Sequence, residues 1–113
     1  MKNTKIFIFV LILLIPLNAL AGMFGPSNFW ECILDEMPGA KNDAVAVAII
    51  RKCAKKFPST APGSESTTEI KKKSPLLGPK TCNECIIKYA EDTTSPKGIN
   101  FIRGACYKLY PKE

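Results

Sequence analysis

The sequence contains no histidine. The usual serine and cysteine nucleophiles depend on an adjacent general base, most often histidine, so the chain lacks the partner that this kind of catalysis requires. Without histidine, a zinc site would have to use cysteine thiolates as its ligands. Cysteines of an exported protein, which this chain is expected to be, are oxidised to disulfides and cannot serve in this way. We therefore expect no catalytic residue, no metal site and no cofactor.

Patterns typical of β-strands are also missing, and the chain has only one long apolar run, over residues 6–15. Pro16 ends this run well short of the roughly 20 apolar residues that span a membrane. The small residues Ala19 and Ala21 match the pattern that signal peptidases cleave. The sequence predicts a signal peptide over residues 1–21, and hence an exported protein that is periplasmic or secreted.

Acidic residues are fewer than basic ones, 10 against 16, which gives a net charge of +6. The net charge falls to +4 once the two lysines of the signal peptide are removed. This excess is too small and too dispersed for the basic stripe that nucleic-acid binding requires, so the expected partner is an envelope or extracellular protein. The basic run Lys71, Lys72 and Lys73 has two interpretations: it keeps the linker solvated, which we favour, or it makes a weak contact with an anionic surface.

The chain nearly repeats itself at a distance of 53 residues. Glu31-Cys32-Ile33 recurs as Glu84-Cys85-Ile86, and the next cysteine follows 21 positions later in both copies, so one small unit is used twice. Cysteines of an exported protein are properly interpreted as a disulfide framework. The repeat predicts the bonds Cys32–Cys53 and Cys85–Cys106. Cys82 lies outside both pairs, either buried or available for a bond to a second chain in a covalent homodimer.

Helix-capping signals and apolar residues at helical spacing predict two helices in each copy. The expected helices are 29–37 and 43–56 in the first copy, and 82–90 and 96–109 in the second. The fold class is all-α, with two tandem disulfide-stapled helical hairpins, 22–58 and 81–113, joined by a flexible linker. The linker, 59–80, is rich in Ser, Thr, Pro and Lys and is expected to be disordered. We favour two packed hairpins over two tethered ones, because each alone has little core.

Three motifs leave alternatives open. The pair Phe29-Trp30 is either part of the core or an exposed anchor for a partner, with the core favoured. Adjacent carboxylates such as Asp35-Glu36 point apart on a helix and are read as solvated charge. Cys82-x-x-Cys85 at a helix start is the motif of thiol-disulfide oxidoreductases, although its usual strand-helix-strand context is absent.

The favoured function is a non-catalytic binding or structural module of the bacterial envelope. The first alternative is a thiol-disulfide oxidoreductase that uses Cys82 and Cys85. The second is a cationic membrane-active secreted effector, which requires basic residues along one face of a helix. The basic residues of helix 43–56 lie instead at one end of it: Arg51, Lys52, Lys55 and Lys56.

Residues 30–39, followed by Asn42-Asp43-Ala44 and residues 49–53, resemble a motif of small exported bacterial proteins of unknown function, the "four-cysteine" proteins. The resemblance covers most of the first copy and, more loosely, residues 85–111 of the second. It implies export, two cysteine pairs and a bacterial source, and it implies no activity. The fifth cysteine, Cys82, departs from the four-cysteine pattern.

Overall fold

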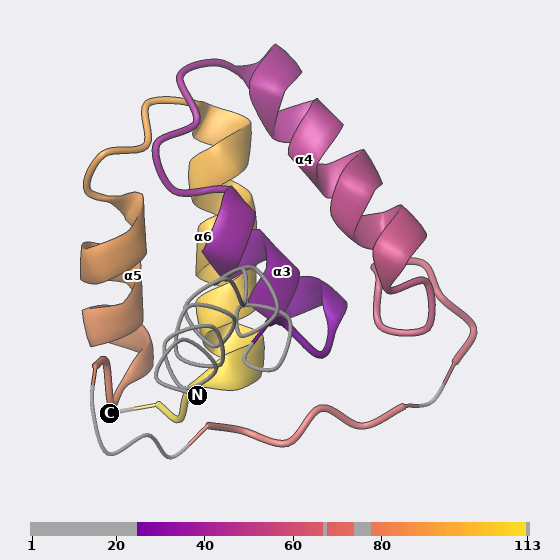
Figure 1. Ribbon diagram of the computed structural model, residues 1–113. Coiled ribbons are helices and arrows are strands. Elements are labelled where there is room, and N and C mark those ends of the chain that lie inside the picture. The colour runs from indigo at the N-terminus through magenta and orange to yellow at the C-terminus, as the bar shows by residue number, and fades with distance from the viewer. Residues whose placement is uncertain (1–24, 67, 74–77, 113) are drawn as a thin grey trace, which may run out of the picture.

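A computed structural model describes residues 25–66, 68–73 and 78–112 of the chain, so the predicted signal peptide lies outside the described residues. The described residues form four helices and no strand (Figure 1). The helices are α3 (Phe29–Glu36), α4 (Asp43–Lys56), α5 (Cys82–Ala90) and α6 (Pro96–Leu109). The prediction of an all-α fold is confirmed, and the observed bounds lie within one residue of the predicted ones.

Each helix begins at a polar side chain that accepts a backbone N–H of the first turn. The four capping residues are Asn28, Asn42, Thr81 and Ser95. Such a cap satisfies one of the donors that the start of a helix leaves unpaired. After α3 the chain turns at Gly39, whose φ of +85° is a conformation that residues with a side chain rarely adopt. These local signals explain why the helix bounds could be predicted.

Two disulfides staple the helices in pairs, Cys32–Cys53 between α3 and α4 and Cys85–Cys106 between α5 and α6. Both bonds join residues 21 positions apart, with a Cα–Cα distance of 5.7 Å. The two hairpins and the two bonds that the repeat predicted are therefore present. Disulfides of this kind indicate an oxidising environment outside the cytoplasm.

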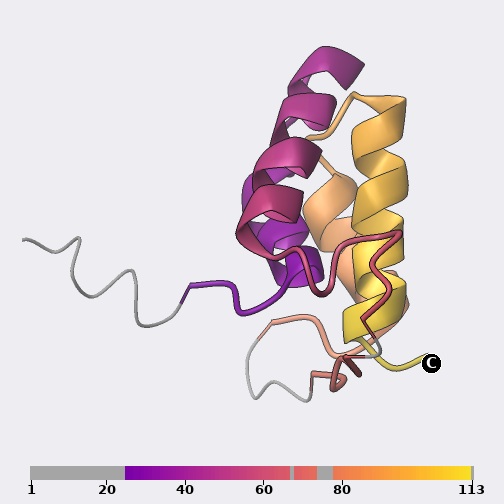
Figure 2. The same ribbon diagram turned by 90° about the vertical axis from the view of Figure 1, so that its right-hand side faces the viewer.

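Helix α6 is the centre of the fold, because it contacts α3, α4 and α5 (Figure 1). Figure 2 shows α6 running beside the α3–α4 hairpin. The side chains buried between them come from both hairpins and include Phe29, Ile33, Ile102 and Leu109, each at most 1% exposed. The two hairpins therefore share one hydrophobic core, as the favoured prediction stated.

The aromatic pair at the start of α3 belongs to this core. Phe29 is fully buried, and the Trp30 ring lies 4.9 Å from it, measured between ring centroids. Trp30 also stacks on Phe101 of α6 at 6.3 Å and covers Gly104, where an added Cβ would come within 3.2 Å of the indole. The prediction that this pair packs in the core is confirmed.

The two interhelical turns are joined by hydrogen bonds. Thr93 accepts from the backbone N–H of Gly39 at 3.0 Å, and the N–H groups of Thr94 and Ser95 both donate to the carbonyl of Ala40 at 3.1 Å. The Ser95 hydroxyl donates to the carboxylate of Asp43 at 2.6 Å. Thr93 and Ser95 are buried, and buried polar groups must be paired to be tolerated. The contact therefore fixes one hairpin relative to the other; we call it the turn junction.

The connecting segment, residues 59–80, is attached to the helices at several points. The Thr60 hydroxyl accepts from the N–H of Phe29 at 2.8 Å, and the N–H of Lys73 donates to the carbonyl of Leu109 at 2.6 Å. Ile70 packs against the core. The sequence predicted a disordered linker here; its described residues make these contacts, whereas residues 67 and 74–77 lie outside the described part.

Candidate functional site

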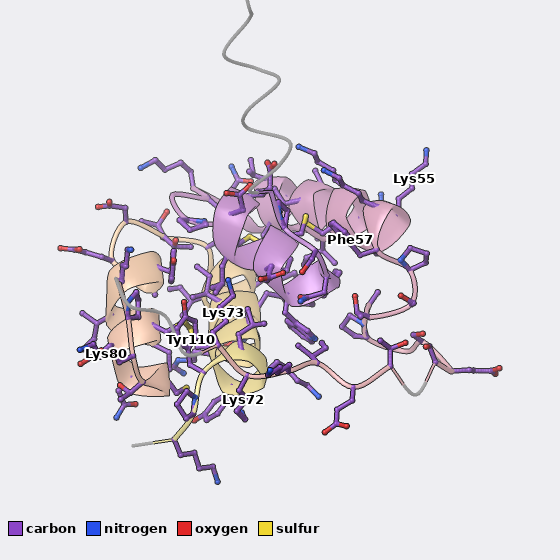
Figure 3. The ribbon with its side chains drawn as sticks, turned by 60° about the horizontal axis from the view of Figure 1, so that its bottom comes forward. Lys55, Phe57, Lys72, Lys73, Lys80 and Tyr110 are labelled. Atoms are coloured by element: carbon purple, nitrogen blue, oxygen red, sulfur yellow. A yellow bond between two sulfur atoms is a disulfide. The ribbon has the colours of Figure 1, made fainter. Side chains whose placement is uncertain are left out.

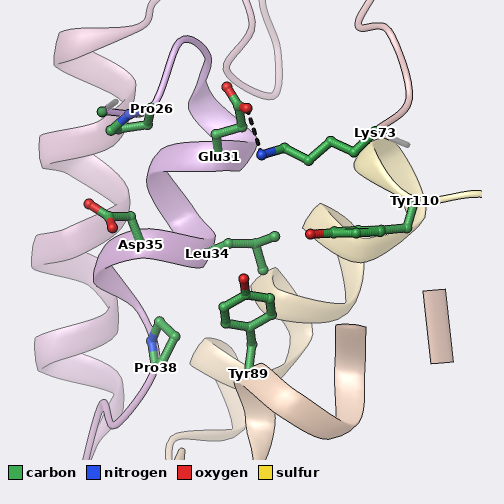
Figure 4. Close-up of a pocket in the computed structure, with 9 residues that line it drawn as sticks. Pro26, Glu31, Leu34, Asp35, Pro38, Lys73, Tyr89 and Tyr110 are labelled. Atoms are coloured by element: carbon green, nitrogen blue, oxygen red, sulfur yellow. Dashed lines mark ion pairs between the residues drawn. The ribbon is translucent and has the colours of Figure 1, made fainter. Parts of the chain in front are cut away.

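A groove of about 380 Å³ opens beside α3, and residues from four parts of the chain form its wall (Figure 4). Its main lining residues are Glu31, Leu34 and Asp35 of α3, Lys73 of the connecting segment, Tyr89 of α5 and Tyr110 at the end of α6. Because α3 belongs to the first repeat and α5 and α6 belong to the second, the groove exists only when the two hairpins are packed together. We call it the α3 groove.

Glu31 and Lys73 form an ion pair at one end of the groove, with 2.9 Å between Nζ and Oε1. Figure 4 shows the Lys73 side chain crossing to α3. Glu31 also accepts from the backbone N–H of Ser27 at 2.9 Å and from its hydroxyl. Partial burial acts to raise the pKa of Glu31, but hydrogen bonds from Ser27 and Lys73 outweigh it and hold the pKa below its ordinary value. Glu31 is therefore a carboxylate that stays ionised and supplies negative charge to the groove.

Two tyrosines form the opposite wall, and their hydroxyl groups point toward Leu34 (Figure 4). Burial raises the pKa of Tyr110 to about 12, and a hydrogen bond with Tyr89 and the charge of Glu31 add to this effect. The Tyr110 hydroxyl is therefore neutral at physiological pH. The groove thus combines carboxylates, aromatic rings and the apolar side chain of Leu34.

The adjacent carboxylates Asp35 and Glu36 have different surroundings. Glu36 pairs with Lys52 of α4 at 3.1 Å, outside the groove. Asp35 is exposed and lines the groove on the opposite side of Leu34 from Tyr110 (Figure 4). The prediction that the two carboxylates point apart is confirmed.

The cysteines of the Cys82-x-x-Cys85 motif are not bonded to each other. Cys85 is bonded to Cys106, and both are fully buried. Cys82 is only 4% exposed, and its backbone N–H donates to the carbonyl of Pro111 at 3.0 Å. It occupies the place that the buried Phe29 has in the first repeat. Disulfide exchange needs an accessible thiol, so this arrangement favours a structural role for all three cysteines. The burial of Cys82 also disfavours a bond to a second chain.

Two of the three consecutive lysines have partners within the chain. Lys72 donates to the backbone carbonyls of Tyr107 and Tyr110 at 2.8 and 3.1 Å, at the C-terminal end of α6, where a cation is favoured by the helix dipole. Lys73 pairs with Glu31. Figure 3 shows both lysines at the end of α6, and Lys55 projecting from the end of α4. Lys71 and Lys72 are both exposed, as expected of residues that meet an anionic surface, whereas Lys73 is half-buried.

Within the described ranges, no group of three or more His, Cys, Asp or Glu residues is arranged to hold a metal ion. None of the helices in that part of the chain has the length and apolar character needed to cross a bilayer. Comparison of the chain with protein-family models, with curated proteins and with solved structures found no match. The resemblance to the four-cysteine proteins therefore stays a prediction.

Sequence reasoning did not identify the α3 groove. Tyr89 and Tyr110 were not singled out as binding residues, and Lys73 was considered only for contact with an anionic surface, because the three come together only through contacts between the repeats. One signal was present in the sequence: the repeat places Lys88 in α5 where α3 has Asp35. The two copies therefore carry opposite charges at this position.

Proposed function

We propose that this protein is an exported, non-catalytic binding module of the bacterial envelope, and that it contacts its partner through the α3 groove. The observation that carries this proposal is the groove itself, an open and partly aromatic concavity built jointly by two stapled hairpins. Tyrosine is enriched at binding hot spots because its ring offers a large contact area at low cost in conformational entropy.

Rigidity supports the same proposal. The walls of the groove are held by the two disulfides, the shared core and the turn junction, so little conformational entropy is lost when a partner binds. The chain has no histidine, the residue that most often serves as the base beside a serine or cysteine nucleophile, and this favours binding over catalysis. Export is supported by the two disulfides and by the apolar N-terminal run.

Site-directed photo-crosslinking in cells that export the full chain tests the proposal. A benzophenone amino acid replaces Pro38 in the groove, and in a matched control it replaces Lys55 at the exposed end of α4. We expect a discrete crosslinked adduct from position 38 and none from position 55. Equal crosslinking at both positions, or no adduct at either, would overturn the assignment of the groove as the binding surface.

Export is tested separately by intact-mass analysis of the protein from the periplasm and the medium. We expect a chain that begins at Gly22 and has lost the mass of four hydrogen atoms through two disulfides. A full-length chain retained in the cytoplasm with reduced cysteines would contradict the location but leave the groove available for binding. The two experiments therefore fail independently.

A further inference from the structure

Asp35 carries a negative charge at a position in its helix where a positive charge would be more stabilising. Asp35 lies in the last turn of α3, where the helix dipole is negative and carboxylates are disfavoured. The same position in α5 holds Lys88, which has the favourable sign. Glu36, also in the last turn of α3, is compensated by its ion pair with Lys52, and Asp35 has no ion pair of this kind among the described residues. An exposed, unfavourably placed carboxylate in a groove suggests a role in binding.

Two lysines of this chain contact groups that line the groove. The Lys73 ammonium group pairs with Glu31 in the groove, and the ammonium group of Lys88, which is not a lining residue, lies 5.2 Å from the centre of the Tyr89 ring. Carboxylates and tyrosine rings are the two groups that bind ammonium and guanidinium ions in proteins, the first by charge and the second through the ring quadrupole. Both kinds of group line the α3 groove, and both hold lysine side chains of this protein.

The Glu31–Lys73 pair is open to exchange. The Lys73 side chain is 38% exposed and the Glu31 side chain 19%, so the pair is partly open to solvent, and solvent-accessible ion pairs contribute little to stability. Lys73 reaches the groove from the connecting segment, not from a helix of the shared core, so its side chain can leave Glu31 without unpacking any helix. A second cation can therefore replace it at low cost.

From these contacts we propose that the α3 groove binds a lysine or arginine side chain of a partner polypeptide between Asp35, Glu31 and the two tyrosines, and that Lys73 occupies the same carboxylate when the partner is absent. This inference rests on the proposed function and gives the ligand its chemical class. Lys73 acts here as an internal competitor. Its removal should strengthen binding, an effect that a purely structural ion pair would not produce.

The test is a titration of the full mature, oxidised protein, followed through its backbone amide signals by NMR. The probes are blocked Gly-Lys-Gly, Gly-Gln-Gly and Gly-Glu-Gly peptides. We expect the lysine peptide to shift the signals of Leu34, Asp35 and Tyr89, and the other two peptides to leave them in place. The shifts should weaken as the salt concentration rises, because the contact depends on exposed charges.

Three variants complete the test. Lys73→Gln should tighten binding of the lysine peptide, and Asp35→Asn should weaken it, each by about two- to fivefold, the range of a single exposed ion pair. Glu65→Gln, which removes an exposed carboxylate of the connecting segment outside the groove, should leave the affinity unchanged. The spread of amide signals in each spectrum verifies that the variant is folded.

Several results would overturn the inference. One is equal binding of the glutamine peptide in the groove, which would leave the groove a binding surface but not one selective for cations. Another is a Lys73→Gln variant that binds the lysine peptide no more tightly than the parent protein. Shifts confined to residues outside the groove, or no shifts with any peptide, would also contradict it. In these cases the crosslinking experiment decides separately whether the groove binds a partner of another kind.

Discussion

The hydroxyl of Ser95 donates a hydrogen bond of 2.6 Å to Oδ1 of Asp43, across 52 positions of the chain. Ser95 also caps α6 by accepting from the N–H of Gly98, so one buried hydroxyl is used twice. Asp43 accepts in addition from the backbone N–H of Lys97 at 3.2 Å, which places its charge at the N-terminal end of α6. The first turns of α4 and α6 are therefore joined by a carboxylate in the position that a helix dipole favours.

This contact predicts a loss of stability in acid. Hydrogen bonds from Ser95 and Lys97 hold the pKa of Asp43 below its ordinary value of 3.8 in the folded chain. Because the folded pKa is the lower one, the stabilisation is present above about pH 4 and is lost as pH falls further. We expect Asp43→Asn to be less stable than the parent protein at pH 6 and to show a smaller further loss between pH 6 and pH 3. Urea unfolding followed by circular dichroism measures both.

Glu69→Gln serves as the control for charge removal, because Glu69 is an exposed carboxylate of the connecting segment. Its stability should follow that of the parent protein at both pH values. An Asp43→Asn variant with the full acid sensitivity of the parent would contradict the role given to the Ser95 contact.

Removal of the Ser95 hydroxyl tests the same junction from its other side. Ser95→Ala loses the cap of α6, which alone costs about 1 kcal/mol, and it leaves Asp43 without its closest donor. We therefore expect Ser95→Ala to lower the free energy of unfolding somewhat more than the matched cap variant Asn42→Ala does. The side chain of Asn42 caps α4, and the structure records no contact between it and the other hairpin at the turn junction. Equal losses in the two variants, measured by urea unfolding, would show that the junction adds nothing to the cap.

The two disulfides should contribute nearly equally to stability, since both close a loop between residues 21 positions apart. Loop entropy predicts about 3 kcal/mol for each bond. We expect each of the double variants, Cys32→Ala/Cys53→Ala and Cys85→Ala/Cys106→Ala, to unfold in one transition, at a lower urea concentration than the parent protein. Two separate transitions, with only one hairpin affected, would indicate independent hairpins instead of a shared core.

The shared core also predicts that a large residue of one hairpin stabilises the other. Phe29→Ala removes a fully buried ring and should cost about 3–5 kcal/mol. The control is Ile87→Ala on α5, because Ile87 is 72% exposed and should lose less than about 1 kcal/mol. Hydrogen exchange should then show faster opening of α6 amides in Phe29→Ala, although Phe29 belongs to α3. Effects limited to α3 and α4 would contradict this prediction.

The raised pKa of Tyr110 predicts that the folded protein loses stability at alkaline pH. Burial raises its pKa to about 12 in the folded chain, above the ordinary value of 10.0. Because the folded pKa is the higher one, the stabilisation is complete below pH 10 and is lost as pH rises toward 12. A spectrophotometric titration of tyrosine ionisation should show a step near pH 12 that disappears in Tyr110→Phe. A profile unchanged by this substitution would assign the step to another tyrosine.

The helices and both disulfides could be predicted because their determinants are local or repeated. Asn28 and Ser95 were recognisable as caps from the residues that follow them, and the repeat identified Cys32–Cys53 and Cys85–Cys106 by equal spacing. Such signals act within a few residues or within one repeat, so they can be recognised in the sequence without knowing how the hairpins pack.

The contacts between the repeats could not be predicted in the same way. The cap at Ser95 was visible in the sequence, but its bond to Asp43 depends on the relative orientation of two hairpins. The same holds for Lys73, which was considered as a solvated charge and instead pairs with Glu31 across the α3 groove. No local pattern encodes such pairs, because their partners come from separate parts of the chain and meet only in the packed molecule.

The most direct test of the packed arrangement is a nuclear Overhauser experiment on the oxidised protein, with Trp30 as the probe. Trp30 is the only tryptophan of the chain, and its ring lies against Phe101 and Gly104 of the other repeat. We predict cross-peaks from the indole protons to the ring of Phe101 and to the α-protons of Gly104. Cross-peaks from Trp30 only to residues of its own hairpin would contradict the shared core, and with it the α3 groove that both hairpins form.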